Sequence, residues 1–70
     1  MEIGDISKGN DKIIVAVKEF KGKEYIDIRI HFENDKGEWI PTKKGITIAP
    51  DNVDEMIRLL QEAREQMVKK

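Results

Sequence analysis

Basic and aromatic side chains gather in residues 20–32 and again near residue 43, and together they could bind a single-stranded nucleic acid. Aromatic rings stack on bases with little sequence preference, and lysine and arginine neutralise phosphates. The candidate residues in these two regions are Phe20, Lys21, Lys23, Tyr25, Arg29, Lys43 and Lys44, with Lys18 just before the first region. Because the formal net charge is only −1, such binding depends on local arrangement. The alternative is an ordinary solvated strand face, on which lysines and single aromatics are common.

Few residues support catalysis or metal binding. The chain has no Cys and a single His, which removes disulfides, thiolate nucleophiles and Cys-based zinc sites. His31 has no second ligand in the sequence pattern, and the acidic residues Glu33, Asp35 and Glu38 lack the spacing of a calcium loop. Ser7 is the only serine and has no His partner implied by the pattern. We expect no enzyme, no metal site and no cofactor.

The length and composition predict one small domain. A chain of 70 residues forms a marginal core, and small scaffolds often add disulfides, a metal or a second subunit. With the first two nearly excluded, oligomerisation remains. No apolar run approaches the roughly 20 residues of a membrane span, and the N-terminal residues lack the layout of a signal peptide. We expect a cytoplasmic protein with no membrane partner.

Two alternating segments, residues 13–20 and 25–32, predict a hairpin whose loop is Lys21-Gly22. This register pairs Phe20 with Lys23. It collects on one face Ile13, Val15, Val17, Ile26, Ile28 and Ile30. It leaves on the other face Ile14, Ala16, Lys18, Phe20, Lys23, Tyr25, Asp27 and Arg29. A slip of one residue would scramble both faces, so the pattern supports the register. The first face is the expected core, and Asp27 is expected to pair with Arg29.

The remaining segments predict a turn at residues 34–37, a short strand at 38–42 and another from residue 45, connected by Lys43-Lys44. This connection would turn Trp39 toward the core beside Ile48, with base stacking by Trp39 as the alternative. From Pro50 the apolar spacing predicts an amphipathic helix over the aliphatic face, with Lys69 and Lys70 at its C-terminal end. Residues 1–11 are expected to be flexible, and residues 12–70 to form the domain.

The segments "EFKGKEYIDIR" and "GEWIPTKKGITI", followed by a helix, resemble the single-stranded-DNA-binding C-terminal domain of the positive cofactor four family of transcriptional coactivators. The resemblance covers about residues 12–68. It implies an α+β fold: a four-stranded curved antiparallel β-meander and one C-terminal amphipathic helix, assembled as a homodimer. The nucleic-acid-binding residues that it implies are Phe20, Lys21, Gly22, Lys23, Arg29, Phe32, Lys43, Lys44 and Gly45.

Within that set, the resemblance implies that Phe20 stacks on a base, that the lysines contact phosphates and that Arg29 reaches from the channel floor. Phe32 also occupies a stacking position, but strict alternation would place it on the core face beside Ile30. Its role therefore requires the strand to bend or bulge near His31. Ile40 stands where a basic residue is frequent in the family, so one phosphate contact is expected to be lost or replaced by an apolar contact.

The function expected from the resemblance is largely sequence-independent binding of single-stranded DNA by a homodimer, in transcription regulation or in DNA replication and repair. RNA and melted duplex are left open as ligands, and transcription or replication proteins as partners. A prokaryotic or phage origin and a nucleoid-associated location are expected. The alternative function is a protein-interaction adaptor that uses the same exposed sheet face.

Overall fold

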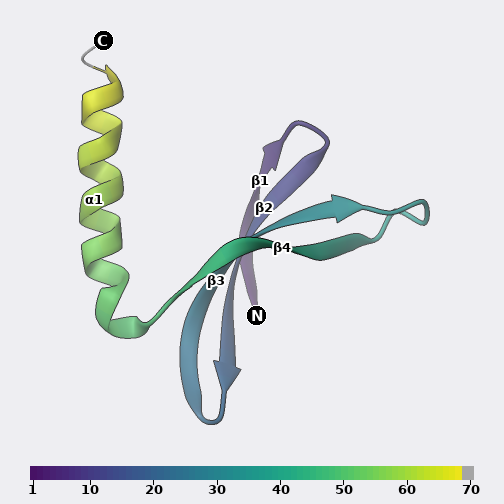
Figure 1. Cartoon of the computed structure of the whole chain (residues 1–70), viewed down its shortest axis with the longest axis horizontal. Coiled ribbons are helices and arrows are strands. Elements are labelled where there is room, and N and C mark those ends of the chain that lie inside the picture. Colours follow the sequence, from purple (N-terminus) through teal and green to yellow (C-terminus); the bar gives the residue numbers. More distant parts are fainter. Residues whose placement is uncertain (69–70) are drawn as a thin grey trace.

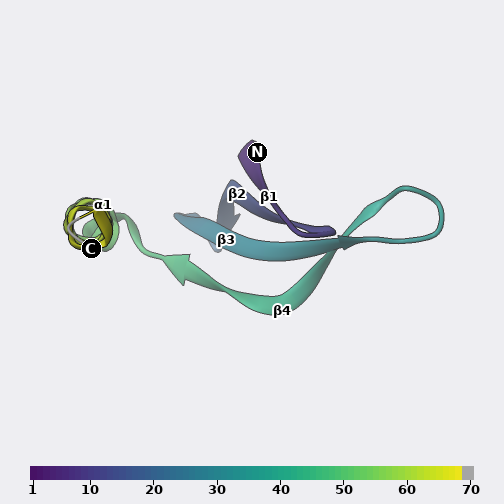
Figure 2. The same ribbon diagram turned by 90° about the horizontal axis from the view of Figure 1, so that it is seen from above.

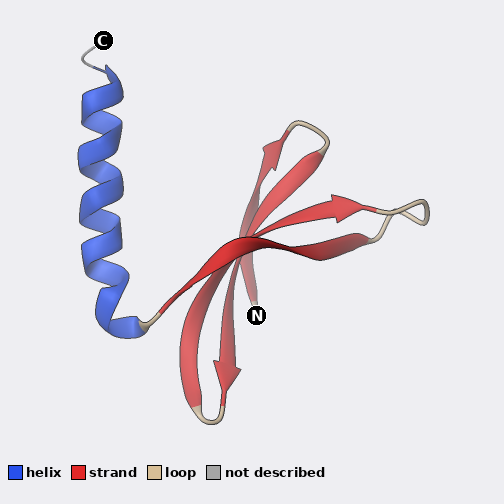
Figure 3. Cartoon of the chain, in the orientation of Figure 1, coloured by secondary structure: helices blue, strands red, loops and turns tan. Residues whose placement is uncertain are grey.

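The computed structural model describes residues 1–68, which form four strands and one helix. In chain order they are β1 (Glu2–Lys8), β2 (Asp11–Phe20), β3 (Lys23–Glu33), β4 (Trp39–Ile48) and α1 (Pro50–Val68). Each strand pairs antiparallel with the next, in the order β1-β2-β3-β4 (Figures 1 and 3). The predicted fold class, a curved antiparallel meander followed by one helix, is confirmed (Figure 2). Lys69 and Lys70, expected at the helix end, lie outside the described residues.

The β2–β3 hairpin has the predicted register along its whole length, from Phe20 opposite Lys23 to Ile13 opposite Ile30. Its two loop residues, Lys21 and Gly22, both have positive φ angles, 53° and 79°. Positive φ at both positions is the requirement of the type I′ turn, whose twist matches that of the two flanking strands. The hairpin is therefore fixed by its turn as well as by its side-chain pattern.

The first strand, β1, was missed in the sequence, where residues 1–11 were expected to be flexible. β1 pairs with β2 from Lys8 opposite Asp11 onward, and the amino group of Met1 donates a hydrogen bond of 2.8 Å to the carbonyl of Val17. The signal was the dipeptide Gly9-Asn10. A glycine with positive φ, here 59°, at the first position of a two-residue loop favours a hairpin. The expectation of an irregular start was wrong for residues 2–8.

The predicted strands at residues 38–42 and 45 onward are one continuous strand, β4, so the proposed loop at Lys43-Lys44 was wrong. β4 pairs with β3 along two stretches separated by a shift. Arg29 lies opposite Gly45, whereas His31 lies opposite Pro41. The residues of β4 between these two partners form a bulge, which we call the Thr42–Lys44 bulge. β4 therefore continues past the two lysines instead of reversing at them.

The helix does not cover the aliphatic face, which corrects the expectation. α1 lies beside the sheet and contacts mainly β3 (Figures 1 and 2). Since Ala49 alone separates β4 from α1, the chain has no length in which to fold back over the sheet. Ile48, at this junction, is 6% exposed, whereas Ile46 is 52% exposed on the same face. The described helix is not long and apolar enough to cross a membrane.

The most buried side chains of the described residues lie mainly on the other, more polar face. Ile14 and Ala16 are 8% exposed and Asp27 is 3% exposed. No helix within residues 1–68 covers this face, so neighbouring side chains must shield it. Lys18 and Arg29 do so, because their terminal nitrogens lie 3.5 and 3.1 Å from the Asp27 carboxylate. The expected division into a buried aliphatic face and an open polar face therefore does not hold in this chain taken alone: the aliphatic residues of β2 and β3 are only half-buried, and the middle of the polar face is buried while its hairpin tip is exposed.

Candidate nucleic-acid interface

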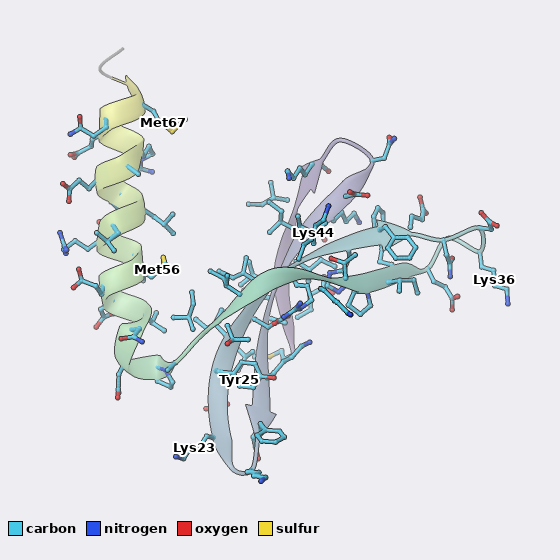
Figure 4. All side chains as sticks on the ribbon, in the orientation of Figure 1. Lys23, Tyr25, Lys36, Lys44, Met56 and Met67 are labelled. Carbon is cyan, nitrogen blue, oxygen red and sulfur yellow. The ribbon has the colours of Figure 1, made fainter. Side chains whose placement is uncertain are left out.

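The tip of the β2–β3 hairpin presents an aromatic ring and two lysines to solvent. Phe20 is 66% exposed, and the Nζ of Lys21 lies 5.4 Å from the centre of its ring. Lys23 and Tyr25 extend from the same hairpin (Figure 4). Phe20, Lys23 and Tyr25 line a shallow hollow of about 420 Å³ together with Glu24, Thr47, Ala49 and Pro50. The hollow has room for a flat ring beside Phe20, with an ammonium group next to it.

Asp27 and Arg29 form a polar network in the middle of the same face, as predicted. Nε and Nη2 of Arg29 donate to the Asp27 carboxylate at 3.3 and 3.1 Å. Burial by itself would raise the pKa of Asp27, but the hydrogen bond from Arg29 and the charges of Lys18 and Arg29 outweigh burial and lower that pKa. The carboxylate therefore stays charged at neutral pH and fixes the guanidinium.

The guanidinium of Arg29 also holds the Thr42–Lys44 bulge. Its Nη1 donates to the carbonyl of Thr42 at 2.8 Å. The hydroxyl of Thr42 donates to the carbonyl of Ile30 at 2.8 Å and accepts a hydrogen bond of 3.1 Å from the backbone N–H of Lys44. These bonds satisfy backbone groups that the register shift leaves without ladder partners. Much of the hydrogen-bonding capacity of Arg29 is therefore used within the protein.

Gly45 allows β4 to approach β3 closely just after the bulge. A Cβ atom at this position would lie 2.7 Å from the carbonyl oxygen of Ile28 and 3.0 Å from the Cα of Arg29. Both are backbone atoms, which cannot move aside as a flexible side chain could. Glycine is therefore required for a structural reason at residue 45, directly after Lys43 and Lys44: it lets β4 cross β3 at short range.

The predicted lysines are free of carboxylates but lie in two groups. Within residues 1–68, no ion pair involves Lys21, Lys23, Lys43 or Lys44. Figure 4 shows Lys23 near the hairpin tip and Lys44 at the middle of the sheet, where β4 crosses it. The structure therefore brings Phe20, Lys21 and Lys23 together, and places Lys43 and Lys44 further along the sheet.

Phe32 lies on the face that strict alternation predicted, whereas Trp39 lies on the face opposite to the expected one. Phe32 lies opposite Ile40, on the aliphatic face by alternation, and is 42% exposed. An irregularity does occur next to His31, but its extra residues belong to β4 and leave the alternation of β3 intact. Trp39 lies opposite Glu33 rather than Ile48, so it belongs to the face of Arg29. The expectation of a core-facing Trp39 was wrong because it depended on the false Lys43-Lys44 loop.

Two further residues of this face were not singled out in the sequence. The Nζ of Lys12 lies 4.4 Å from the centre of the Trp39 ring, and Thr42 fixes the bulge. Neither carries a motif of its own, and Lys12, which lies opposite His31, falls just outside the predicted hairpin strands. Within the described residues, no group of three or more His, Asp or Glu side chains could hold a metal ion.

A curved antiparallel sheet that exposes an aromatic ring and unpaired lysines is typical of nucleic-acid-binding sheets that lack a recognition helix. Comparison with family models narrows this class. Residues 7–59 match the model of transcriptional coactivator p15 (PC4). The chain belongs to this family of DNA-binding transcriptional coactivators, which confirms the resemblance seen in the sequence.

Solved structures of bacterial and phage proteins share the fold. A PC4 homolog from Burkholderia pseudomallei is 28% identical, with a TM-score of 0.87 over 91% of this chain and 88% of that chain. A bacteriophage T5 homolog of PC4, implicated in recombination-dependent DNA replication, is 28% identical with a TM-score of 0.64. That match covers 99% of this chain and 76% of the phage chain. These relatives fit a prokaryotic or phage member of the family.

Proposed function

We propose that this protein binds single-stranded DNA as a homodimer, without strong sequence preference, in transcription or in DNA replication and repair. One observation carries the proposal: an exposed ring, Phe20, stands between Lys21 and Lys23 on a sheet that bears two further lysines without carboxylate partners. A base stacks on the ring, and the ammonium groups neutralise the adjacent phosphates. We propose no catalytic role.

The described elements suit a single strand better than a duplex. Duplex recognition usually places a helix in the major groove, but the only described helix has Asp51 in its first turn and no basic residue in its last turn. Arg58 forms ion pairs with Glu55 and Glu62. A single strand, in contrast, has free base faces that a ring on a strand can reach. The hairpin tip supplies that ring.

The proposed homodimer follows from an incomplete core. No large side chain of the described residues is fully buried, and Ile57, Leu60 and Met67 of α1 are 48%, 60% and 71% exposed. The aliphatic face of the sheet is also only partly covered. Monomeric proteins rarely expose contiguous apolar patches of this kind, and a second copy offers the same two surfaces in return. We therefore propose that α1 and the aliphatic face bury each other across a two-fold interface.

The proposed site residues are those expected from the sequence, but the proposed role of Arg29 changes and that of Phe32 stays a prediction. Phe20 is proposed to stack on a base, while Lys21, Lys23, Lys43 and Lys44 contact phosphates. Gly22 and Gly45 shape the turn and the strand crossing. Arg29 is proposed to act chiefly by holding the Thr42–Lys44 bulge. A stacking role of Phe32 stays a prediction, and the change Phe32→Ala tests it by comparison with Phe20→Ala.

Fluorescence anisotropy with labelled oligo-dT tests the proposal. The wild type should bind at low salt, and Phe20→Ala should weaken binding about 5- to 100-fold, the range found for loss of one stacked base. The pair Lys43→Met with Lys44→Met should also weaken it. The control pair Lys8→Met with Lys36→Met removes equal charge from the β1 end and from the β3–β4 turn, and should have less effect. Peptide binding that added single strands do not reduce, and that the Lys43 and Lys44 variants retain, would instead favour a protein-interaction adaptor.

Sedimentation equilibrium tests the dimer separately. The wild type should sediment as a dimer, and Leu60→Glu should shift it toward monomer because it places a charge in the apolar surface of α1. Gln61→Glu adds the same charge one residue further along the helix and should leave the dimer intact. A wild type that stays monomeric at high concentration would contradict the proposed interface.

A further inference from the structure

Two aromatic rings lie far apart along the sheet on the same face, and each has a lysine beside it. The Nζ of Lys21 lies 5.4 Å from the centre of the Phe20 ring, and the Nζ of Lys12 lies 4.4 Å from the centre of the Trp39 ring. The pairing of Trp39 with Glu33 puts it on the side of Tyr25 and Arg29, since these three β3 positions alternate with the aliphatic ones. The first ring belongs to the proposed interface, and the second has no assigned role.

The environment of Trp39 suits a stacking platform. Trp39 is half-buried, so its ring is held in place and little freedom is lost when a ligand covers it. Lys12 contacts one face of the ring, and its Nζ is also 4.0 Å from Asp5. The Lys12 side chain is 30% exposed and its long stem can move. Exposed Glu33 beside the ring repels phosphates, which leaves the Lys12 side for a nucleic acid backbone.

We propose that Trp39 is a second base-stacking position for the single strand, and that Lys12 moves from the ring to the adjacent phosphate when a base arrives. This inference rests on the proposed single-strand binding and extends its path across the sheet. An ammonium that water still reaches, like that of Lys12, contributes less over a ring than a stacked base does. The displaced Lys12 then gains a phosphate partner, so the exchange favours the bound state.

The spacing of the two rings sets a length requirement. Phe20 lies opposite Lys23 and Trp39 opposite Glu33, so the two rings are ten residues apart along β3, which is about 33 Å at the rise of a β-strand. At the 3.4 Å per nucleotide of a stacked strand, this distance corresponds to about ten nucleotides. A strand of about four nucleotides covers less than half of it. Short oligonucleotides should therefore occupy one ring, and longer ones both.

Anisotropy with two oligonucleotide lengths tests this inference. For oligo-dT of about 15 nucleotides, Trp39→Ala should weaken binding roughly 5- to 100-fold, whereas for about 4 nucleotides the loss should be much smaller. Phe20→Ala should weaken both. If Phe20→Ala weakens binding and Trp39→Ala leaves both lengths unchanged, the second stacking position is refuted while single-strand binding stands. If the wild type binds neither length, both proposals fail.

The fluorescence of Trp39, the only tryptophan, gives a readout that needs no variant. Stacking of a base should quench it, so the long oligonucleotide should quench more than the short one at equal site occupancy. Trp39→Phe keeps a ring and should retain most of the affinity, even if Trp39→Ala is too unstable to measure. Absence of quenching at saturation by the long oligonucleotide would overturn the inference.

The salt dependence of binding tests the role of Lys12. Each phosphate contact to a single strand contributes about 0.7 to the slope of log K against log salt. Lys12→Met should therefore lower the slope for the long oligonucleotide by about 0.7. Lys8→Met removes the same charge from the other face of the sheet, opposite Asp11, and should leave the slope unchanged. Equal slopes for Lys12→Met and wild type would refute the proposed movement of Lys12.

Discussion

Replacing Asp27 by Asn should destabilise the protein without changing the shape of the side chain. Asp27 is 3% exposed, accepts hydrogen bonds from Arg29 at 3.1 and 3.3 Å and lies 3.5 Å from Lys18 Nζ. Removing one partner of a buried ion pair costs about 3–5 kcal/mol. Here the side chains of Arg29 and Lys18 are 22% and 46% exposed, so water can compensate in part. We expect a loss of about 2 kcal/mol at pH 7.

The pH dependence of this loss has a definite sign. The pKa of Asp27 is lowered in the folded state, so its carboxylate contributes stability above the unfolded pKa of about 4. That contribution is lost as the pH falls through the folded pKa. The stability difference between the wild type and Asp27→Asn should therefore be largest near neutral pH and shrink in acid below about pH 4.

Urea denaturation followed by circular dichroism, at equal protomer concentrations, measures both effects. Asp35→Asn serves as the matched control, because Asp35 is exposed in the β3–β4 turn and should change stability by less than about 0.5 kcal/mol. An Asp27→Asn variant as stable as this control at pH 7 would refute the reasoning. So would a difference that stays constant down to acid pH.

Three further predictions concern the crossing of β4 over β3. Gly45→Ala should cost about 1–3 kcal/mol of unfolding free energy, because the new methyl group would meet backbone at 2.7 Å; Gly4→Ala, with open space around it, is the control. Thr42→Val should lower the melting temperature by removing two hydrogen bonds worth about 1 kcal/mol each, and Thr42→Ser should restore it. Thr42→Val should also weaken single-strand binding more than Thr42→Ser, since the bulge carries Lys43 and Lys44; equal affinities would show that the bulge does not position them.

The hairpin was predictable because two independent signals agreed. The alternation of residues 25–32 set the faces, and the dipeptide Lys21-Gly22 set the loop, so the register followed residue by residue. The family motif then located the candidate site. Where only one signal was present, the prediction was less secure. Residues 2–8 lacked clear alternation, and their hairpin was signalled only by Gly9-Asn10.

The rest depended on tertiary contacts that a local pattern does not contain. The Thr42–Lys44 bulge is stabilised by Arg29 and by the carbonyl of Ile30, which lie more than ten residues away. The sequence does not show that contact, so Lys43-Lys44 was interpreted as a loop. This interpretation placed Trp39 on the wrong face of the sheet. The position of α1 beside the sheet depends on the one-residue link at Ala49. The amphipathic pattern of α1 predicts only that its apolar side packs against some apolar surface, and does not say which one.

The central claim is that the exposed rings and lysines of this sheet select single strands. The most direct measurement is competition: labelled oligo-dT bound to the protein is displaced by an unlabelled mixed-sequence strand, or by the same sequence as a duplex. We predict that the single strand displaces the label at concentrations at least about tenfold lower than the duplex, because only the single strand offers free base faces to stack. Equal displacement by both would contradict the account.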